Sequence, residues 1–124
     1  MISKIKHILR GLKNLWRWRK VVYRDRDFDH WFIYEMLKTK LRFQADSIYK
    51  NGTHATAKSN VTVMLKCIDM IDKVQNEYYI DQALTGLEMY DWTDVQWEEA
   101  VKKHDDTRKL LFKTLEENIE RWWD

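Results

Sequence analysis

The fold follows from residues 57–71, which read AKSNVTVMLKCIDMI. Apolar side chains recur in this stretch at steps of four, three, four and three residues. They are Ala57, Val61, Met64, Ile68 and Ile71. Residues at this spacing lie on one side of an α-helix and form the seam of a helical bundle or coiled coil. The stretch therefore predicts a helix whose seam is buried against other helices.

The segment before this seam predicts a second long helix. Asp27 or Asp29 caps its start, and Asn51-Gly52 ends it because both residues tolerate a left-handed backbone. Its predicted inner face consists of Trp31, Tyr34, Leu37, Leu41, Ala45 and Ile48. A turn this short joins antiparallel neighbours. Residues 27–85 therefore predict a helix hairpin, whose second helix restarts at Thr53 or Thr56, continues past Tyr78 and frays before Gly86.

Two further helices flank the predicted hairpin. In residues 1–24, an apolar stripe lies opposite basic side chains. The stripe consists of Ile2, Ile5, Leu9, Leu12 and Trp16. Residues 93–124 predict a C-terminal helix that begins with a capping box formed by Thr93 and Gln96. Its predicted inner face consists of Trp97, Val101, His104, Arg108, Leu111, Leu115 and Trp122.

The composition agrees with an all-α fold. The 124 residues include no proline and only three glycines, and both residue types weaken helix interiors. A chain of this length fits one domain. Seven tryptophans are more than a core of this size buries, and exposed aromatic side chains mark interfaces. We therefore predict a single all-α domain, residues 1–124, that assembles as a homo-oligomer.

The chemistry-bearing residues do not predict an enzyme. The single cysteine, Cys67, lies on the seam helix, where a buried thiol is the usual outcome. The four histidines are His7, His30, His54 and His104, and they lack the spacing of metal ligands. We predict no catalytic residue, no metal and no cofactor. With no secretory signal and no apolar run long enough to span a membrane, we expect a soluble protein of the cytoplasm.

The charge is unevenly distributed. Residues 1–24 carry eight basic side chains and no acidic one, whereas residues 74–101 carry seven acidic side chains and no basic one. A basic segment attracts phosphates of nucleic acid, nucleotides or lipids. Its densest part is Trp16, Arg17, Trp18, Arg19 and Lys20. Three interpretations stay open: an anionic ligand or nucleic acid, an anionic membrane surface, or pairing with the acidic segment within or between chains.

A second polar cluster surrounds the predicted hairpin turn. It comprises Tyr49, Lys50, Asn51, His54, Thr56, Lys58, Ser59, Asn60 and Thr62. The cluster is rich in donors, contains no acid and lies where a helix begins, and helix N-termini attract anions. It predicts either a phosphate site or an ordinary exposed turn.

Residues 27–79 also carry a set of short motifs. They are Asp27-Phe28-Asp29, Leu37-x-x-Lys40-Leu41, Asn51-Gly52, His54, Ala57-Lys58, Met64-x-x-Cys67, Asp72-Lys73 and Glu77-Tyr78-Tyr79. In these motifs the chain resembles a group of small uncharacterised helical proteins of tailed bacteriophages. The resemblance implies a phage accessory protein that acts in the cytoplasm of a bacterial host. Some small helical phage proteins sequester host immune signalling nucleotides as oligomers, and this context suggests the same role here.

The leading hypothesis is therefore non-catalytic binding of a small phosphorylated ligand, most plausibly a host signalling nucleotide, in phage counter-defence. The residues predicted to neutralise phosphates are Arg24, Arg26, Lys40 and Arg42. His54 and Lys58 are predicted to close the site, and Trp31 or Tyr34 to stack on a base. The alternatives are a nucleic-acid-binding protein that uses residues 16–20, and a host-protein-binding module.

Overall fold

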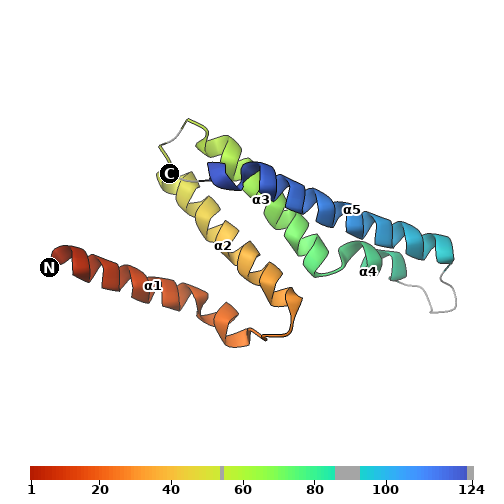
Figure 1. The fold of residues 1–124 in the computed structure, drawn as a ribbon, viewed down its shortest axis with the longest axis horizontal. Coiled ribbons are helices and arrows are strands. Elements are labelled where there is room, and N and C mark those ends of the chain that lie inside the picture. Colours follow the sequence, from red (N-terminus) through yellow and green to blue (C-terminus); the bar gives the residue numbers. More distant parts are fainter. Residues whose placement is uncertain (54, 86–92, 123–124) are drawn as a thin grey trace. The chain divides into compact units, whose positions relative to one another are not determined.

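The computed structural model describes residues 1–53, 55–85 and 93–122. The described residues form α-helices and one short 3-10 helix, with no β-strand among them (Figure 1). The elements are α1 (Ile2–Arg24), α2 (His30–Asn51), α3 (Ala57–Gln75), α4 (Tyr78–Leu84), α5 (Asp94–Asn118) and the 3-10 helix η2 (Ile119–Arg121). The predicted all-α fold class is confirmed.

The chain divides into two compact units, residues 1–36 and 37–124, and α2 contributes residues to both. In the first unit, Asp29 caps the start of α2, because its Oδ1 accepts a hydrogen bond from the backbone N–H of Trp31 at 2.9 Å. This confirms one of the two predicted caps. The predicted single domain and the predicted homo-oligomer both stay predictions.

The second unit contains the core. Its buried apolar side chains are Leu41, Ala45 and Ile48 from α2, Val61, Met64, Cys67, Ile71 and Val74 from α3, Ala100, Leu111 and Leu115 from α5, and Trp122. Helix α3 packs against α5, and α4 packs against both (Figure 1). Burial of a large apolar side chain contributes about 1.5–3 kcal/mol. The core between α3 and α5 therefore supplies most of the stability of this unit.

The predicted seam of α3 is largely correct, with one shift. Val61, Met64 and Ile71 are buried, but Ile68 is only half-buried and Cys67 is fully buried. A straight α-helix has 3.6 residues per turn, so a strict 3.5-residue repeat drifts by about 20° in each heptad. The buried face of α3 therefore centres on Met64 and Ile71, and it includes Cys67 on the side away from Ile68.

The end of α3 differs from the prediction. The helix ends at Gln75, and a separate helix, α4, begins at Tyr78. The Asn76 side chain donates hydrogen bonds to the carbonyl oxygen and to Oδ1 of Asp72, and Glu77 has a left-handed backbone with φ of 50°. Local side-chain bonds of this kind compete with helix continuation. The predicted fraying before Gly86 falls outside the described residues.

The C-terminal helix begins as predicted and ends earlier. Thr93 Oγ1 accepts from the Gln96 N–H at 3.1 Å, and Gln96 Oε1 accepts from the Thr93 N–H at 3.2 Å, which confirms the capping box. The α-helix stops at Asn118 and gives way to η2, although the prediction extended it to residue 124. Residues 123–124 lie outside the described part of the chain.

The segment after α5 is held by polar contacts with α2 and α3. The Asn60 side chain donates to the carbonyl of Arg121 at 3.1 Å, and the Gln44 side chain donates to the carbonyl of Trp122. Trp122 itself is buried. Two helices therefore satisfy backbone carbonyls of the segment that follows α5.

A buried lysine, to which sequence analysis assigned no role, connects α2 with the end of α3. Only 6% of Lys38 is exposed. Its Nζ donates to Gln75 Oε1 at 2.6 Å and to Asp72 Oδ1 at 3.2 Å. A buried ammonium group is tolerated only when it is paired and hydrogen-bonded, as Lys38 is. These bonds fix the position of α2 along α3.

We expect replacement of Lys38 to destabilise the second unit. Lys38→Ala leaves the buried Gln75 without this donor, which costs about 1–3 kcal/mol of unfolding free energy. Lys40→Ala on the same helix is the control, because Lys40 is exposed. Urea denaturation followed by circular dichroism measures both changes. Equal stability of the two variants would show that the Lys38 bonds contribute nothing.

Candidate functional site

The apolar side chains of α1 form a continuous arc. Large aliphatic and aromatic residues follow the helical period from the first turn to Trp16. They are Ile2, Ile5, Ile8, Leu9, Leu12, Leu15 and Trp16. At 3.6 residues per turn, this set covers about 140° of the helix circumference. It includes the predicted stripe and adds Ile8 and Leu15, which share the same face.

A row of basic side chains runs beside this arc. Lys6, Arg10, Lys13 and Arg17 follow steps of four, three and four residues, one position after the apolar row of Ile5, Leu9, Leu12 and Trp16. Two rows offset by one residue lie about 100° apart on a helix. The basic residues were predicted to attract phosphates, but their row was not predicted. The steps of four, three and four residues were the signal for it.

None of the residues of α1 is buried within the first unit. Among the apolar side chains of the arc, the exposed fraction ranges from 50% at Ile5 to 72% at Ile2. Monomeric proteins rarely leave a continuous apolar surface of this size in contact with water. The helix α1 therefore presents two adjacent features for a partner: an open apolar arc and a row of cations.

The residues of the predicted nucleic-acid patch do not lie on a single face of α1. Trp16, Arg17, Trp18, Arg19 and Lys20 are consecutive residues of α1. Five consecutive residues at about 100° per step surround the helix axis. The guanidinium of Arg19 lies over the Trp16 ring at 3.5 Å from its centroid and donates to the Trp16 carbonyl at 2.7 Å. Arg17 belongs to the basic row, whereas Arg19 covers the tryptophan at the end of the arc.

Four of the predicted ligand residues lie in the first unit. Arg24 is exposed in the last turn of α1, and Arg26 lies in the loop before α2. The Trp31 ring packs edge-on against Phe32 at 5.0 Å between centroids, and Tyr34 packs edge-on against His30 at 6.4 Å. A surface pocket of about 370 Å³ contains Arg26. Three carboxylates line the same pocket, those of Asp25, Asp27 and Asp29, and they disfavour a phosphate there.

The other predicted ligand residues belong to the second unit. Lys40 and Arg42 are both exposed on α2, but two residues along a helix lie about 200° apart around its axis. Lys58 lies at the start of α3, and His54 lies outside the described residues. The predicted site stays a prediction. Lys40 and Arg42, which both belong to the second unit, lie on different faces of α2.

A pocket of about 440 Å³ lies at the turn between α2 and α3. Its lining includes Tyr49, Lys50 and Lys58. Lys50 pairs with Asp46 at 3.2 Å, whereas the ammonium of Lys58 has no ion-pair partner among the described residues. This pocket, which we call the tip pocket, lies within the polar cluster predicted from the sequence.

Much of that polar cluster is already hydrogen-bonded within the protein. The Ser59 hydroxyl donates to the Thr56 carbonyl, and the Thr62 hydroxyl donates to the Lys58 carbonyl, each at 3.0 Å. Asn60 donates to Arg121, as described above. These donors serve the backbone, so among the lysines of the cluster that the structure describes, Lys58 is the one without an ion-pair partner.

Cys67 is placed as predicted. It is fully buried in α3, and burial raises the pKa of its thiol. A thiol in apolar surroundings stays protonated and unreactive. Within the described residues, no group of three or more histidine, cysteine, aspartate or glutamate side chains could hold a metal ion.

Comparison with known proteins identifies no relative: no family model, curated protein or solved structure matches the chain. None of the described helices is both long and apolar enough to cross a membrane. The geometry of the side chains is therefore the basis for a functional proposal.

We expect the Cys67 thiol to resist modification in the folded protein. At pH 8, Ellman's reagent should label Cys67 at least about tenfold more slowly in the folded protein than in 6 M guanidinium chloride. Burial shields the thiol from the reagent, and its raised pKa lowers the fraction of reactive thiolate. Absorbance at 412 nm measures the labelling rate. Equal rates in the two conditions would mean that α3 opens readily around Cys67.

Proposed function

We propose that the protein binds anionic membrane surfaces through α1, as a helix that lies in the plane of the lipid headgroups. One observation supports this proposal most directly: an unburied apolar arc of seven side chains runs beside a row of cations in a helix without any acidic residue. This combination is typical of interfacial amphipathic helices.

The apolar arc favours lipid over nucleic acid as the partner. Phosphates of DNA or RNA attract lysine and arginine, but they provide nothing to cover isoleucine and leucine side chains. At a lipid surface, the same helix places its aliphatic side chains among the acyl chains and its cations among the headgroups. Trp16 ends the arc, and tryptophan prefers this boundary region.

The energies are sufficient for reversible binding. A lysine or arginine near an anionic leaflet contributes about 1 kcal/mol. Transfer of an isoleucine or leucine side chain out of water contributes about 1.5–3 kcal/mol when burial is complete, and an interfacial helix gains part of this. With four cations in the row and seven apolar side chains in the arc, both terms are substantial. In the bacterial host that the phage resemblance implies, this surface is the cytoplasmic face of the inner membrane.

A second candidate function is binding of a small phosphorylated ligand at the tip pocket. The observation that favours it is the ammonium of Lys58, which has no ion-pair partner among the described residues and lines a pocket of about 440 Å³ together with Tyr49. The pocket requires α2 and α3 to form the predicted antiparallel hairpin, which we infer from the bonds of Lys38 with Asp72 and Gln75. A nucleotide messenger in phage counter-defence is the ligand that the sequence hypothesis proposes for this pocket.

The membrane proposal predicts binding to vesicles that contain about 30% phosphatidylglycerol but not to vesicles of phosphatidylcholine alone, because the cations need anionic lipid. Leu9→Ser with Leu12→Ser should weaken binding by about tenfold or more through loss of apolar contact. Arg10→Gln with Lys13→Gln should weaken it by a similar factor through loss of charge. Vesicle co-sedimentation and a blue shift of tryptophan fluorescence measure both effects.

Matched controls on α5 and η2 separate these effects from general changes in charge or apolarity. Lys102→Gln with Lys103→Gln removes the same charge from exposed positions, and Val95→Ser with Ile119→Ser removes exposed apolar side chains from the second unit. Both controls should bind as the wild type does. The proposal would be disproved if the wild-type protein did not bind anionic vesicles, or if the variant with both leucine substitutions bound them as tightly as the wild type.

The tip-pocket proposal makes a separate prediction. Lys58→Gln should weaken binding of any cyclic nucleotide found in a calorimetric screen by about fivefold to tenfold or more, because it removes a cation of the pocket lining. Lys102→Gln is the control for loss of one exposed charge. Binding that survives Lys58→Gln would place the nucleotide elsewhere, and absence of binding across the screen would reject this candidate.

A further inference from the structure

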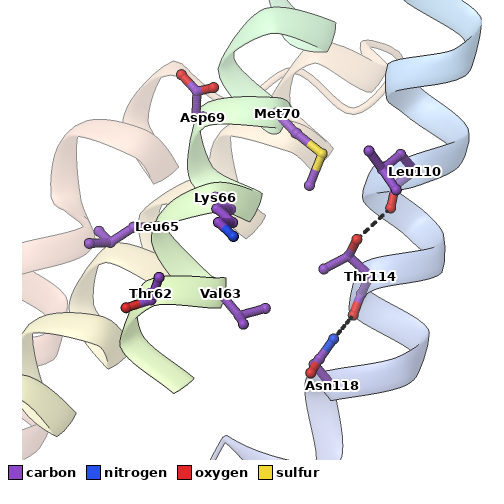
Figure 2. A pocket seen from close by; sticks show the side chains of 9 residues that line it. All are labelled: Thr62, Val63, Leu65, Lys66, Asp69, Met70, Leu110, Thr114 and Asn118. Carbon is purple, nitrogen blue, oxygen red and sulfur yellow. Dashed lines mark hydrogen bonds between the residues drawn. The ribbon is translucent and has the colours of Figure 1, made fainter. Parts of the chain in front are cut away.

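A groove of about 710 Å³ lies between α3 and α5 (Figure 2). Its lining residues are Thr62, Val63, Leu65, Lys66, Asp69, Met70, Leu110, Thr114 and Asn118. Val63 and Met70 lie on the side of α3 that faces α5, and Leu110 and Thr114 on the side of α5 that faces α3 (Figure 2). The groove lies entirely within the second unit and is unrelated to α1.

The polar side chains of the groove present few free hydrogen-bonding groups to a partner. Thr114 donates to the Leu110 carbonyl at 2.7 Å, and Asn118 donates to the Thr114 carbonyl at 2.8 Å (Figure 2). Thr62 is likewise bonded to the backbone of its own helix. Leu65 and Leu110, in contrast, are each more than half exposed. The groove therefore offers a mostly apolar surface.

Among the described residues that line the groove, only Lys66 and Asp69, both on α3, carry a charge. They have opposite signs and lie three residues apart, so they occupy neighbouring positions on one face of the helix. Lys66 forms no ion pair with any residue that the structure describes. Asp69 pairs with Lys73 at 3.2 Å on the surface. An exposed pair of this kind contributes little, and a carboxylate accepts further bonds.

This pair of charges is complementary to itself. A two-fold axis that passes between Lys66 and Asp69 turns α3 antiparallel to the α3 of a second copy. Each Lys66 then lies opposite Asp69 of the other copy, and the contact occurs twice, as in every isologous interface. The same operation brings the apolar linings of the two grooves together.

We propose that the protein forms a two-fold homodimer through this groove, with α3 antiparallel to α3 of the second copy and two reciprocal Lys66–Asp69 ion pairs at its centre. The apolar side chains around the groove supply the affinity. The two ion pairs determine the register, because complementary charges across an interface select orientation and partner.

Charge reversal tests this arrangement. Lys66→Glu alone, and Asp69→Lys alone, each place like charges at both central contacts, and the dimer dissociation constant should rise about tenfold or more. An equimolar mixture of the two single variants restores both attractive contacts, so it should form a heterodimer. The double variant Lys66→Glu, Asp69→Lys should form a homodimer again. Sedimentation velocity at about 1–100 μM measures the four states and the wild type.

Two controls make the result specific. Circular dichroism verifies that each single variant is folded, and recovery of the mixed heterodimer independently excludes misfolding as the cause of dissociation. Leu9→Ser with Leu12→Ser should leave the dimer intact, because α1 does not line the groove. A wild type that is monomeric throughout the concentration range, as expected for a groove that receives a different protein, overturns the proposal. A dimer that survives both single reversals also overturns it.

Discussion

The second unit depends on burial of one face of α3. Met64, Cys67 and Ile71 are completely removed from solvent, as is Leu111 of α5, the helix that packs against α3. Polar bonds of this unit also involve α3 or the segment after α5. Lys38 is bonded to the end of α3, and the carbonyls after α5 are bonded to Gln44 and Asn60. Loss of packing along α3 would leave these polar groups buried without partners, which makes the core and its polar bonds mutually dependent.

Helix α1 follows a different physical rule. Its apolar period is as regular as that of α3, yet its apolar side chains stay exposed. Apolar periodicity indicates only that one face of a helix is to be buried. The charges beside that face indicate which kind of partner buries it. In α3 the flanking charges have mixed signs, which suits a protein neighbour. In α1 they are all positive, which suits an anionic surface. The two interactions proposed above, with lipid and with a second copy, follow from this contrast.

The candidate sites were predictable to different degrees. The stripe from Ile2 to Trp16 was visible in the sequence, because helical spacing is a local property. The set that combined Arg26, Lys40 and Arg42 was chosen by proximity in sequence, and helix geometry separates such neighbours. Lys40 and Arg42 lie on different sides of α2, and carboxylates surround Arg26. The role of Lys38 could not be predicted, because its partners are more than 30 residues away along the chain.

The sequence by itself determined the all-helical fold class, an aspartate cap at Asp27 or Asp29, the capping box at Thr93 and the buried thiol of Cys67, since the caps and the helical pattern depend on residues within a turn or two of one another. Only the tertiary structure decided that α4 packs against α5, although the Asn76 bonds to Asp72 that compete with continuation of α3 are local. It also decided that α3 and α5 leave a groove with Lys66 and Asp69 at its edge. Packing between distant segments makes such surfaces, and no local pattern encodes them.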